Sequence, residues 1–581
     1  MLNKIISVIM SVIIPITGFF YNSLNSIIDA ACEAIFGIPY TVEAIKADFF
    51  SDIDDDDVVE IEEDRGFIND KIAVFLDSEM SFTEKLSFFS RCGGTLAGWC
   101  TPADLYVINY PQMGYDEVLR LCDKLDNESG VELSIPVLVF KNEVNATPDD
   151  DFGSTVVDPL DWDEINPKGK NWWLEAIDAR QAWDYSSEFS KINIGVLDAG
   201  FDTEHPELTG KIRFPDDKQA NRNAPDSHGC HVAGIIGAKH NNGVGIAGIC
   251  DNSELICVDW MPDFLQLWST DIAIFFGFST LVKAGAKVIN VSLGTSGSKA
   301  SDSSSFMETF IVPAATSYMM ASLLSKGYDF IAVQSAGNGD MYGDPIDASN
   351  NGHFCTITED NVFTGSKGVS AKEILNRIII VGSADNDSDG TYTQSSFSNV
   401  GSKVSISAPG KDIYSCTLNG GYESMSGTSM SAPIVTGVAS LVWSVNPSFS
   451  GADVKEIVCT STDSVAEIYT DSEYFYDVEL MEYPMVNAKL AVEEAIRRTD
   501  SNVGTVSGKI IGDAAEIVFG ENSHTVYSDG TYSFVAPQGS KNAEILDKDG
   551  NVIGSFELTV IAGQTVTASD YIIDTSEDIL I

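Results

Sequence analysis

The sequence predicts an α/β protein whose mostly parallel sheet has helices on both faces, together with a small βαββαβ N-terminal domain and a C-terminal all-β sandwich. Three observations predict this organisation. Short apolar runs that end in polar residues alternate with helical stretches through the middle of the chain. Strand-like and helix-like segments alternate before about residue 150, and two-residue alternation of apolar and polar residues prevails from 503 to 575.

We expect the N-terminal domain at residues 65–147. Four strand-like runs, "DKIAVFL", "TLAGW", "DLYVINY" and "ELSIPVLVFKNEV", enclose two segments of helical spacing, "SFTEKLSFF" and "GYDEVLRLCDKLDN". Their order is that of a split βαβ unit. Acidic stretches, "SDIDDDDVVEIEED" before it and "TPDDDFGS" after it, indicate linkers.

The main domain is expected at residues 165–499. The runs "KINIGVLDAG", "KVINVSLG", "DFIAVQSAGN" and "RIIIVGSAD" are typical of buried parallel strands, and "FLQLWSTDIAIFFGFSTLVKAG" is typical of a helix. Polar residues end each strand-like run, at the carboxyl edge where open α/β sheets carry their sites.

Residues 503–575 are expected to form the β-sandwich, and Asp-Gly pairs at 529–530 and 549–550 predict two tight turns. This segment shows no chemistry of its own. It resembles the carboxypeptidase-regulatory-like β modules of secreted bacterial proteins.

Composition excludes several classes of function. The chain has 34 basic against 86 acidic residues, a formal net charge of −52, which repels nucleic-acid backbones and anionic lipid. Ten cysteines without a Cys-x-x-Cys pair argue against a redox or zinc-ribbon protein, and one or two disulfides stay open. An apolar stretch opens the chain, and residues 1–31 are predicted to be a secretory signal peptide, with an uncleaved N-terminal anchor as the alternative.

Three polar residues stand where catalytic groups are expected. Asp198 ends a strand-like run, His228 begins a helix in "SHGCHVAG", and Ser429 precedes a helix in "MSGTSMSAP". A nucleophilic serine needs an imidazole to accept its proton, and the imidazole needs a carboxylate to orient it. A metal at His228 and His231 would need further ligands that the sequence does not supply. The chain order Asp, His, Ser is that of subtilisin, and Ser429 lacks the Gly-x-Ser-x-Gly elbow of esterases.

On these motifs, residues 172–498 resemble the subtilisin-like serine peptidase family. The resemblance implies that Asp198 orients the base, His228 is the general base and Ser429 is the nucleophile. Cys230 replaces a threonine of the family motif and places a thiol beside the base.

The same resemblance assigns the substrate contacts. Asn338, in "AVQSAGNGD", would donate to the oxyanion beside the backbone N–H of the nucleophile. Ser292, Leu293 and Gly294, in "NVSLGTSG", would pair with the extended substrate and wall its main side-chain pocket. Relative to the family, two segments downstream, "SKASDSSSFMETFIVPAATS" (298–317) and "MYGDPIDASNNGHFCTITEDNVFTGSKGVS" (341–370), resemble insertions near the substrate cleft. They hide the floor of that pocket, so no side-chain preference is predicted.

A structural calcium ion is also implied, whereas catalysis needs no cofactor. The loop "HNNGVGIAG" resembles the family's calcium loop, with a side-chain oxygen from Asn242 and carbonyls from Val244 and Ile246. Glu207 stands where the family has an aspartate ligand, and its longer side chain changes the geometry.

Together these features predict a secreted serine endopeptidase that hydrolyses peptide bonds through an acyl-enzyme. Its partners would be protein or peptide substrates. The resemblance implies that its own N-terminal domain acts as an intramolecular chaperone and inhibitor, which would make the chain a zymogen, and the alternative is a retained accessory domain. Nucleic acid is not expected, and a membrane only through a retained N-terminal anchor. The alternative is a catalytically idle surface or binding protein with a subtilisin fold. An ester hydrolase is disfavoured by the chain order of the triad.

Overall fold

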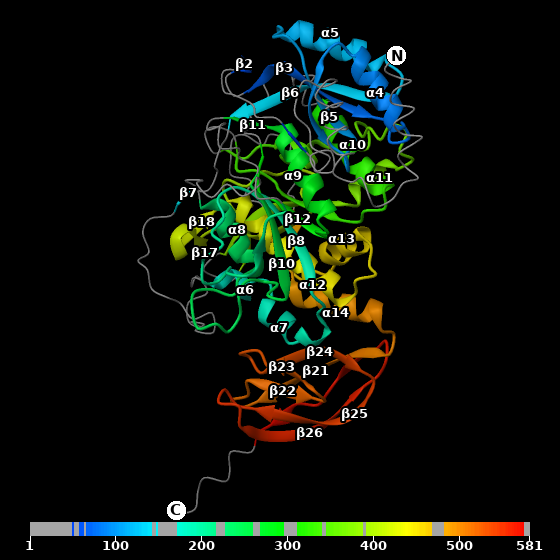
Figure 1. Ribbon diagram of the computed structural model, residues 1–581. Helices are drawn as coiled ribbons and strands as arrows, with labels where there is room; N and C mark the ends of the chain where they lie inside the picture. Colours follow the sequence, from blue (N-terminus) through cyan, green and yellow to red (C-terminus); the bar gives the residue numbers. More distant parts are fainter. Residues whose placement is uncertain are drawn as a thin grey trace, which may run out of the picture. The chain divides into compact units, whose positions relative to one another are not determined.

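The computed structural model describes residues 49–50, 57–62, 65–141, 147–148, 171–215, 227–259, 268–294, 311–339, 344–386, 391–467 and 482–573. The signal peptide or anchor predicted at residues 1–31 lies outside these ranges. The chain divides into two compact units, residues 1–139 and residues 140–581 (Figure 1).

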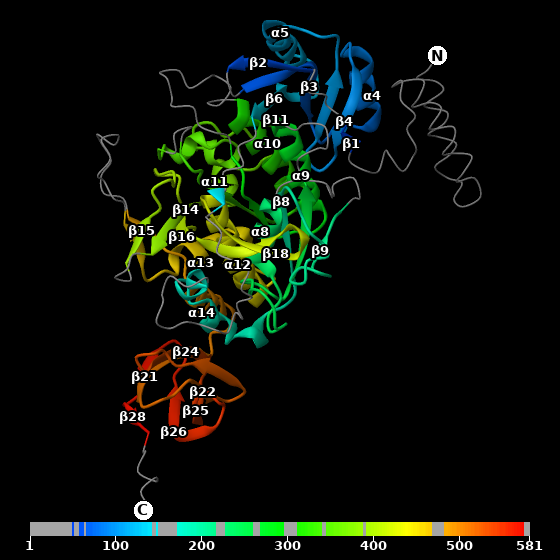
Figure 2. The same cartoon turned by 90° about the vertical axis from the view of Figure 1, so that its left-hand side faces the viewer.

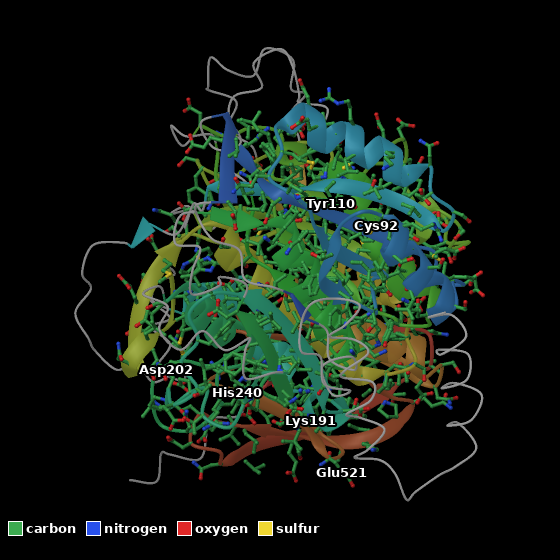
Figure 3. The ribbon with its side chains drawn as sticks, turned by 45° about the horizontal axis from the view of Figure 1, so that its top comes forward. Cys92, Tyr110, Lys191, Asp202, His240 and Glu521 are labelled. Carbon is green, nitrogen blue, oxygen red and sulfur yellow. The ribbon has the colours of Figure 1, made fainter. Side chains whose placement is uncertain are left out.

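The N-terminal unit is an antiparallel sheet with two helices. Its strands follow the order β1-β4-β5-β3-β6, and β2 pairs with β3. The predicted order βαββαβ is confirmed as β3, α4, β4, β5, α5 and β6. On the sheet side of α4, the Tyr110 hydroxyl donates a 3.1 Å hydrogen bond to the carbonyl of Cys92, and both residues are labelled in Figure 3. The elements are β1 (Phe49–Phe50), β2 (Val58–Glu62), β3 (Arg65–Leu76), α4 (Phe82–Arg91), β4 (Thr95–Cys100), β5 (Leu105–Asn109), α5 (Tyr115–Asp126) and β6 (Val131–Lys141).

A ten-stranded sheet forms the centre of the second unit. Its order is β20-β19-β15-β14-β13-β12-β8-β10-β9, with β16 beside β14. The four strands that the sequence predicts, β8, β12, β13 and β14, are parallel neighbours. The strands of this sheet are β8 (Ile192–Asp198), β9 (Ile212–Arg213), β10 (Ser253–Asp259), β12 (Val288–Val291), β13 (Ile331–Ser335), β14 (Ile378–Asn386), β15 (Tyr392–Gln394), β16 (Ile406–Pro409), β19 (Val465–Glu467) and β20 (Glu482–Pro484).

Helices cover both faces of this sheet, as predicted. Val196 of β8 lies in the core shared with α8 and α12, whereas Leu197 points to the opposite face and packs on Gly277 of α9. Figure 2 shows α8 and α12 in the middle of this unit, where they pack against each other. The helices are α6 (Trp172–Glu175), α7 (Ala179–Trp183), η2 (Ser186–Glu188), α8 (His228–Gly237), α9 (Asp271–Lys283), α10 (Val312–Ser325), η5 (Ala348–Asn350), η6 (His353–Thr356), α11 (Ala371–Leu375), η7 (Leu418–Gly420), α12 (Thr428–Val445), α13 (Gly451–Thr460) and α14 (Ala488–Thr499).

One helix is shorter than its sequence predicts. The helical pattern extends over residues 264–285, but α9 begins at Asp271, and the short strand β11 (Trp268–Thr270) precedes it. An acidic first residue suits the positive end of the helix dipole, which favours a start at Asp271. Trp268, in the strand before it, continues the hydrophobic pattern without continuing the helix.

A second, small sheet lies next to α8. Strands β17 (Ile413–Thr417) and β18 (Gly421–Ser426) form a hairpin, and β7 (Thr147–Pro148) pairs antiparallel with the last residues of β18. Ser415 of the hairpin donates a 2.7 Å hydrogen bond to the carbonyl of His231, which ties β17 to α8.

The C-terminal residues form two four-stranded sheets, which confirms the predicted all-β sandwich. Gly530 and Gly550 adopt positive φ angles of 82° and 79° in the two predicted Asp-Gly turns, a conformation that glycine tolerates best. Strand β23 is not apparent in the sequence pattern. The strands are β21 (Val503–Ile511), β22 (Glu516–Phe519), β23 (Asn522–Thr525), β24 (Thr531–Pro537), β25 (Gly539–Leu546), β26 (Val552–Val560), β27 (Thr565–Thr567) and β28 (Tyr571–Ile572).

The structure also bears on the cysteines and on the apolar helices of the chain. The nine cysteines within the described ranges are all free, so no disulfide forms among them. Among the described helices, α12 alone is long and apolar enough to cross a membrane, and 94% of its apolar window is buried inside the protein, as in the core helix of a folded domain.

Candidate active site

The carboxyl end of β8 and the start of α8 bring Asp198 and His228 into contact. Their side chains are 3% and 6% exposed, and Nδ1 of His228 lies 2.6 Å from Oδ1 of Asp198. The backbone N–H of Ala199 donates a second hydrogen bond to the same oxygen at 2.8 Å. A carboxylate on Nδ1–H fixes the tautomer in which Nε2 carries the lone pair. The pair is therefore built to present Nε2 as a proton acceptor.

Ser429 lies in the first turn of α12, the helix that packs against α8. It is 5% exposed, and its Oγ donates a long, 3.5 Å hydrogen bond to the carbonyl of Ser292 at the end of β12. The predicted triad thus comes from the end of one central strand and the first turns of two helices that pack together. Leu293 and Gly294 continue from Ser292 along the same edge, and Gly294 is exposed there.

A chain of buried hydrogen bonds holds the nucleophile segment. Thr436 of α12 donates to Asn290 (3.0 Å), whose amide donates to the hydroxyl of Ser292 (2.9 Å). That hydroxyl donates in turn to the carbonyl of Ser429 (2.8 Å). Because Asn290 and Thr436 are fully buried, the chain is shielded from water and fixes α12 against β12.

Asn338 follows β13 and faces the start of α12. Its Oδ1 accepts 2.8 Å hydrogen bonds from both the N–H and the hydroxyl of Thr428, the residue before the nucleophile. Fixing the oxygen in this way also fixes the direction of the amide nitrogen, the group predicted to donate to an oxyanion. Thr428 further accepts from the N–H of Gly337 at 3.1 Å.

The residues beside His228 are buried and uncharged. Burial, and next the proximity of His228, lowers the pKa of His231 to about 3. Burial raises the pKa of the Cys230 thiol to about 12. A neutral, deeply buried thiol is a poor nucleophile, so Cys230 is not expected to react as a thiolate. Within the described ranges, no three His, Cys, Asp or Glu side chains gather as metal ligands.

The four residues predicted to hold calcium lie together, but they bind one another. Glu207 is fully buried, and its carboxylate accepts hydrogen bonds from the N–H of Ile246 (2.9 Å), the amide of Asn242 (2.6 Å) and the hydroxyl of Tyr422 (3.2 Å). The Asn242 oxygen accepts from the N–H of Val244 at 3.1 Å. Calcium takes six to eight oxygen ligands, whereas hydrogen-bond donors surround this carboxylate. The arrangement does not fit a calcium ion.

We call this hydrogen-bonded group of Glu207, Asn242, Ile246 and Tyr422 the Glu207 latch. A Cβ at Gly245 would lie 2.1 Å from the Glu207 Oε1 and 2.2 Å from the Tyr422 hydroxyl, so the two side chains pack directly on this glycine. Burial raises the pKa of Glu207, and its hydrogen bonds to Ile246, Asn242 and Tyr422 oppose that rise. Calcium at this loop stays a prediction of the sequence.

The chain matches known proteins over the region that carries these residues. Residues 190–479 match the model of the subtilase family of peptidases. Thermitase of Thermoactinomyces vulgaris is 30% identical over 297 residues, which span 50% of this chain and 88% of thermitase. This chain belongs to the subtilase family.

Other relatives of this subtilase are longer than the matched region. A subtilisin of Bacillus sp. strain TA39 is 29% identical over 306 residues, 49% of this chain and 64% of that protein. The chain therefore spans less than two thirds of that relative's length. Among solved structures, fervidolysin from Fervidobacterium pennivorans, described as a keratinolytic enzyme related to subtilisin, aligns over 88% of this chain and 79% of its own with a TM-score of 0.51 and 18% identity. That likeness concerns the fold, which is subtilisin-like.

Sequence reasoning overlooked three residues of this subtilase that act on the predicted site. Thr428 anchors Asn338, and Asn290 and Thr436 hold the nucleophile segment. Thr428 lies in the motif "MSGTSMSAP" and Asn290 in "NVSLGTSG", so their membership of these motifs is the sequence signal that could have identified them. Thr436 lies in an apolar helix, and only the packing of α12 on β12 reveals its role.

Proposed function

We propose that this subtilase is a secreted serine endopeptidase that cleaves peptide bonds through an acyl-enzyme. The observation that carries the proposal is the buried 2.6 Å contact between His228 and Asp198, since His228 begins a helix that packs against α12, whose first turn holds Ser429. A buried carboxylate–imidazole pair next to a helix-start serine is the arrangement that activates a hydroxyl for acyl transfer.

The reaction proceeds in two steps. His228 accepts the Ser429 proton at Nε2 as Oγ attacks the peptide carbonyl, and Asp198 stabilises the imidazolium through Nδ1–H. The amide of Asn338 and the N–H of Ser429 donate to the developing oxyanion. The imidazolium then protonates the leaving amine, and water repeats the sequence to release the acyl group.

The substrate lies extended along the edge formed by Ser292, Leu293 and Gly294. An exposed strand end supplies backbone donors and acceptors for an added strand, which binds any sequence through its main chain. The preference for a substrate side chain then depends on what lies between this edge, which follows β12, and the end of the neighbouring strand β13. Protein and peptide chains are the substrates that fit this mode of binding.

The N-terminal domain, residues 65–147, acts as a propeptide of the peptidase domain, residues 165–499. Pairing of β7 with β18 supports this role, because β18 ends at Ser426, shortly before the nucleophile in the chain. The apolar leader predicted at residues 1–31 favours export. Cleavage between residues 145 and 165 would release the mature enzyme.

Fluorophosphonate labelling tests the proposal. The purified chain and a Ser429→Ala variant are incubated, and intact mass is read before and after a fluorophosphonate is added. We expect one label on the wild type and none on the variant. Loss of about 150 N-terminal residues only in the wild type would establish self-processing, with cleavage in the stretch proposed above, between residues 145 and 165.

A processed, folded wild type that takes no label would refute the peptidase and favour the idle binding protein. Folding is checked by circular dichroism on both samples. A long-chain ester series serves as the control for substrate class, since a peptidase of this kind should cleave the peptides and leave those esters intact.

A further inference from the structure

Two glycines on neighbouring strand ends contact the same side chain. A Cβ at Gly294 would lie 2.0 Å from the Oδ1 of Asn351, and a Cβ at Gly337 would lie 2.6 Å from that same atom. Real Cβ atoms do not approach other atoms so closely, so both positions need glycine. The Asn351 amide therefore fills the space between the two strand ends.

That space adjoins the predicted nucleophile. Ser292, shortly before Gly294, contributes the carbonyl that lies 3.5 Å from the Oγ of Ser429. Gly337 donates to the hydroxyl of Thr428 at 3.1 Å on the other side. Strands β12 and β13 are parallel neighbours, so their two carboxyl ends lie side by side. Asn351 thus stands next to the nucleophile, between the edge predicted to bind substrate and the edge predicted to hold the oxyanion.

Asn351 is held in place from several directions. It is 5% exposed, its Nδ2 donates a 2.9 Å hydrogen bond to the carbonyl of Ser335, and its N–H donates to the carbonyl of Ala348 at 3.0 Å. Asn399 fixes the same region, with its amide oxygen accepting 3.0 Å hydrogen bonds from the N–H groups of Gly339 and Ile346. A side chain held in this way cannot move aside at low cost.

We propose that Asn351 closes the side-chain pocket of this peptidase, so that the residue whose carbonyl is attacked must be glycine, alanine or serine. The proposal rests on the proposed function. Asn351 acts by its volume, because its amide nitrogen already donates to Ser335. A larger side chain would need to displace a buried, hydrogen-bonded amide, and an aromatic ring would not fit between the two glycines.

Kinetics on a matched substrate series test this assignment. The processed enzyme is titrated with a fluorophosphonate, and kcat/KM per active site is measured for peptide p-nitroanilides that differ only in the residue before the scissile bond: Gly, Ala, Ser, Leu or Phe. We expect the wild type to favour the three small residues over Leu and Phe by tenfold or more, the discrimination that a few methylenes carry in a pocket.

Two variants should move the preference in opposite directions. Asn351→Ala should raise the Leu-to-Ala and Phe-to-Ala ratios of kcat/KM by about tenfold. Asn351→Gln should lower activity on Ala while keeping activity on Gly. Asn350→Ala should leave every ratio unchanged. This matched amide is the last residue of the short helix η5, directly before Asn351, and its side chain is not among the nearest neighbours of either glycine.

The outcomes separate this inference from the proposed function. A labelled enzyme that cleaves after Phe as fast as after Ala overturns the inference and leaves the peptidase intact. Equal ratios for Asn351→Ala and wild type overturn it as well, because titration with the label counts only folded active sites. A processed chain that takes no label overturns the peptidase, and the inference with it.

Discussion

Tyr185 and Glu493 form a buried hydrogen bond of 2.9 Å, in which the tyrosine hydroxyl donates to the carboxylate. The same hydroxyl accepts a 2.8 Å hydrogen bond from the backbone N–H of Val535 in β24. Arg497 donates to the other carboxylate oxygen at 3.0 Å. The Tyr185 side chain therefore joins α14 of the peptidase region to the β-sandwich. This buried polar junction makes the sandwich part of the same folded body rather than a tethered module.

Tyr185→Phe should destabilise the protein by about 2 kcal/mol, because the N–H of Val535 and one oxygen of Glu493 would lose their partner in a buried site. The measurement is urea unfolding in a Ser429→Ala background, which prevents autolysis. Tyr328→Phe, at a half-buried loop position, is the matched control. Equal midpoints for the two variants would show that the junction contributes nothing.

His524 should make the sandwich interface sensitive to acid. It is 3% exposed and stacks on Phe534 with ring centroids 4.0 Å apart, and burial lowers its pKa to about 4. The unfolded chain takes up this proton at about pH 6.5, so stability is lost as the pH falls from about 6.5 to about 4. As the pH is lowered through this interval, we expect the melting temperature of His524→Phe to rise steadily relative to that of wild type, because the variant has no imidazole to protonate.

The control for that measurement is Phe534→Leu, which removes the stacking partner and changes no titrating group. Its melting temperature should differ from that of wild type by an amount that does not depend on pH. If the difference between His524→Phe and wild type is also constant between pH 6.5 and pH 4, then His524 is not the group that takes up the proton.

Local patterns were sufficient to predict that Asp198 ends a strand, that His228 and Ser429 begin helices, and that the first two meet. Asp198, His228 and Ser429 each lie in a short motif next to a strand or helix boundary, and the chain order of the motifs identifies the type of hydrolase. Parallel strands place such boundaries on one sheet edge, so contact between Asp198 and His228 follows from the fold class. The element order of the N-terminal unit was predictable for the same reason, since each strand and helix has its own periodicity.

Contacts made by distant segments were not predictable from the sequence. Tyr422 reaches Glu207 from a hairpin far along the chain and donates its hydroxyl to that carboxylate. Asn351 belongs to an insertion without any periodic pattern, yet it reaches Gly294 and Gly337. Such contacts depend on how loops pack over the sheet edge, and neither propensity nor alternation encodes that packing.

The Glu207 latch should make stability independent of calcium. We expect EDTA to change the melting temperature by less than about 1 °C, because a bound ion at a hundred times its Kd would contribute about 2.7 kcal/mol, or several degrees. Glu207→Gln should lower the melting temperature by several degrees, since its amide would face the amide of Asn242, and Tyr422→Phe should lower it less. A large loss in EDTA that calcium restores would instead establish an ion at this loop.

Thr436 should act on catalysis through Asn290 as a positioning residue. Thr436→Val removes the 3.0 Å hydrogen bond to Asn290 and loosens the chain that ends at the carbonyl of Ser429. A small displacement of a nucleophile can cost up to about 100-fold, so we expect kcat to fall about tenfold with KM unchanged. Thr436→Ser keeps the hydroxyl and should restore kcat. Loss of activity in both variants, or a rise in KM, would indicate a structural role alone.

Asn338 should stabilise the transition state and should not affect the binding of substrate. Its oxygen is fixed by the N–H and the hydroxyl of Thr428, and the proposed mechanism assigns the contact with the oxyanion to its amide nitrogen. Asn338→Ala should lower kcat by about 100- to 1,000-fold, the loss found when subtilisin loses such a donor, and leave KM within about twofold. Thr428→Ser keeps both donors to Asn338 and should retain most of the activity. Because attack on the phosphorus of the label also builds negative charge on an oxygen, now at a five-coordinate centre that then expels fluoride, fluorophosphonate labelling of Asn338→Ala should slow as well. Labelling at the wild-type rate together with a slow kcat would place the defect outside the oxyanion site.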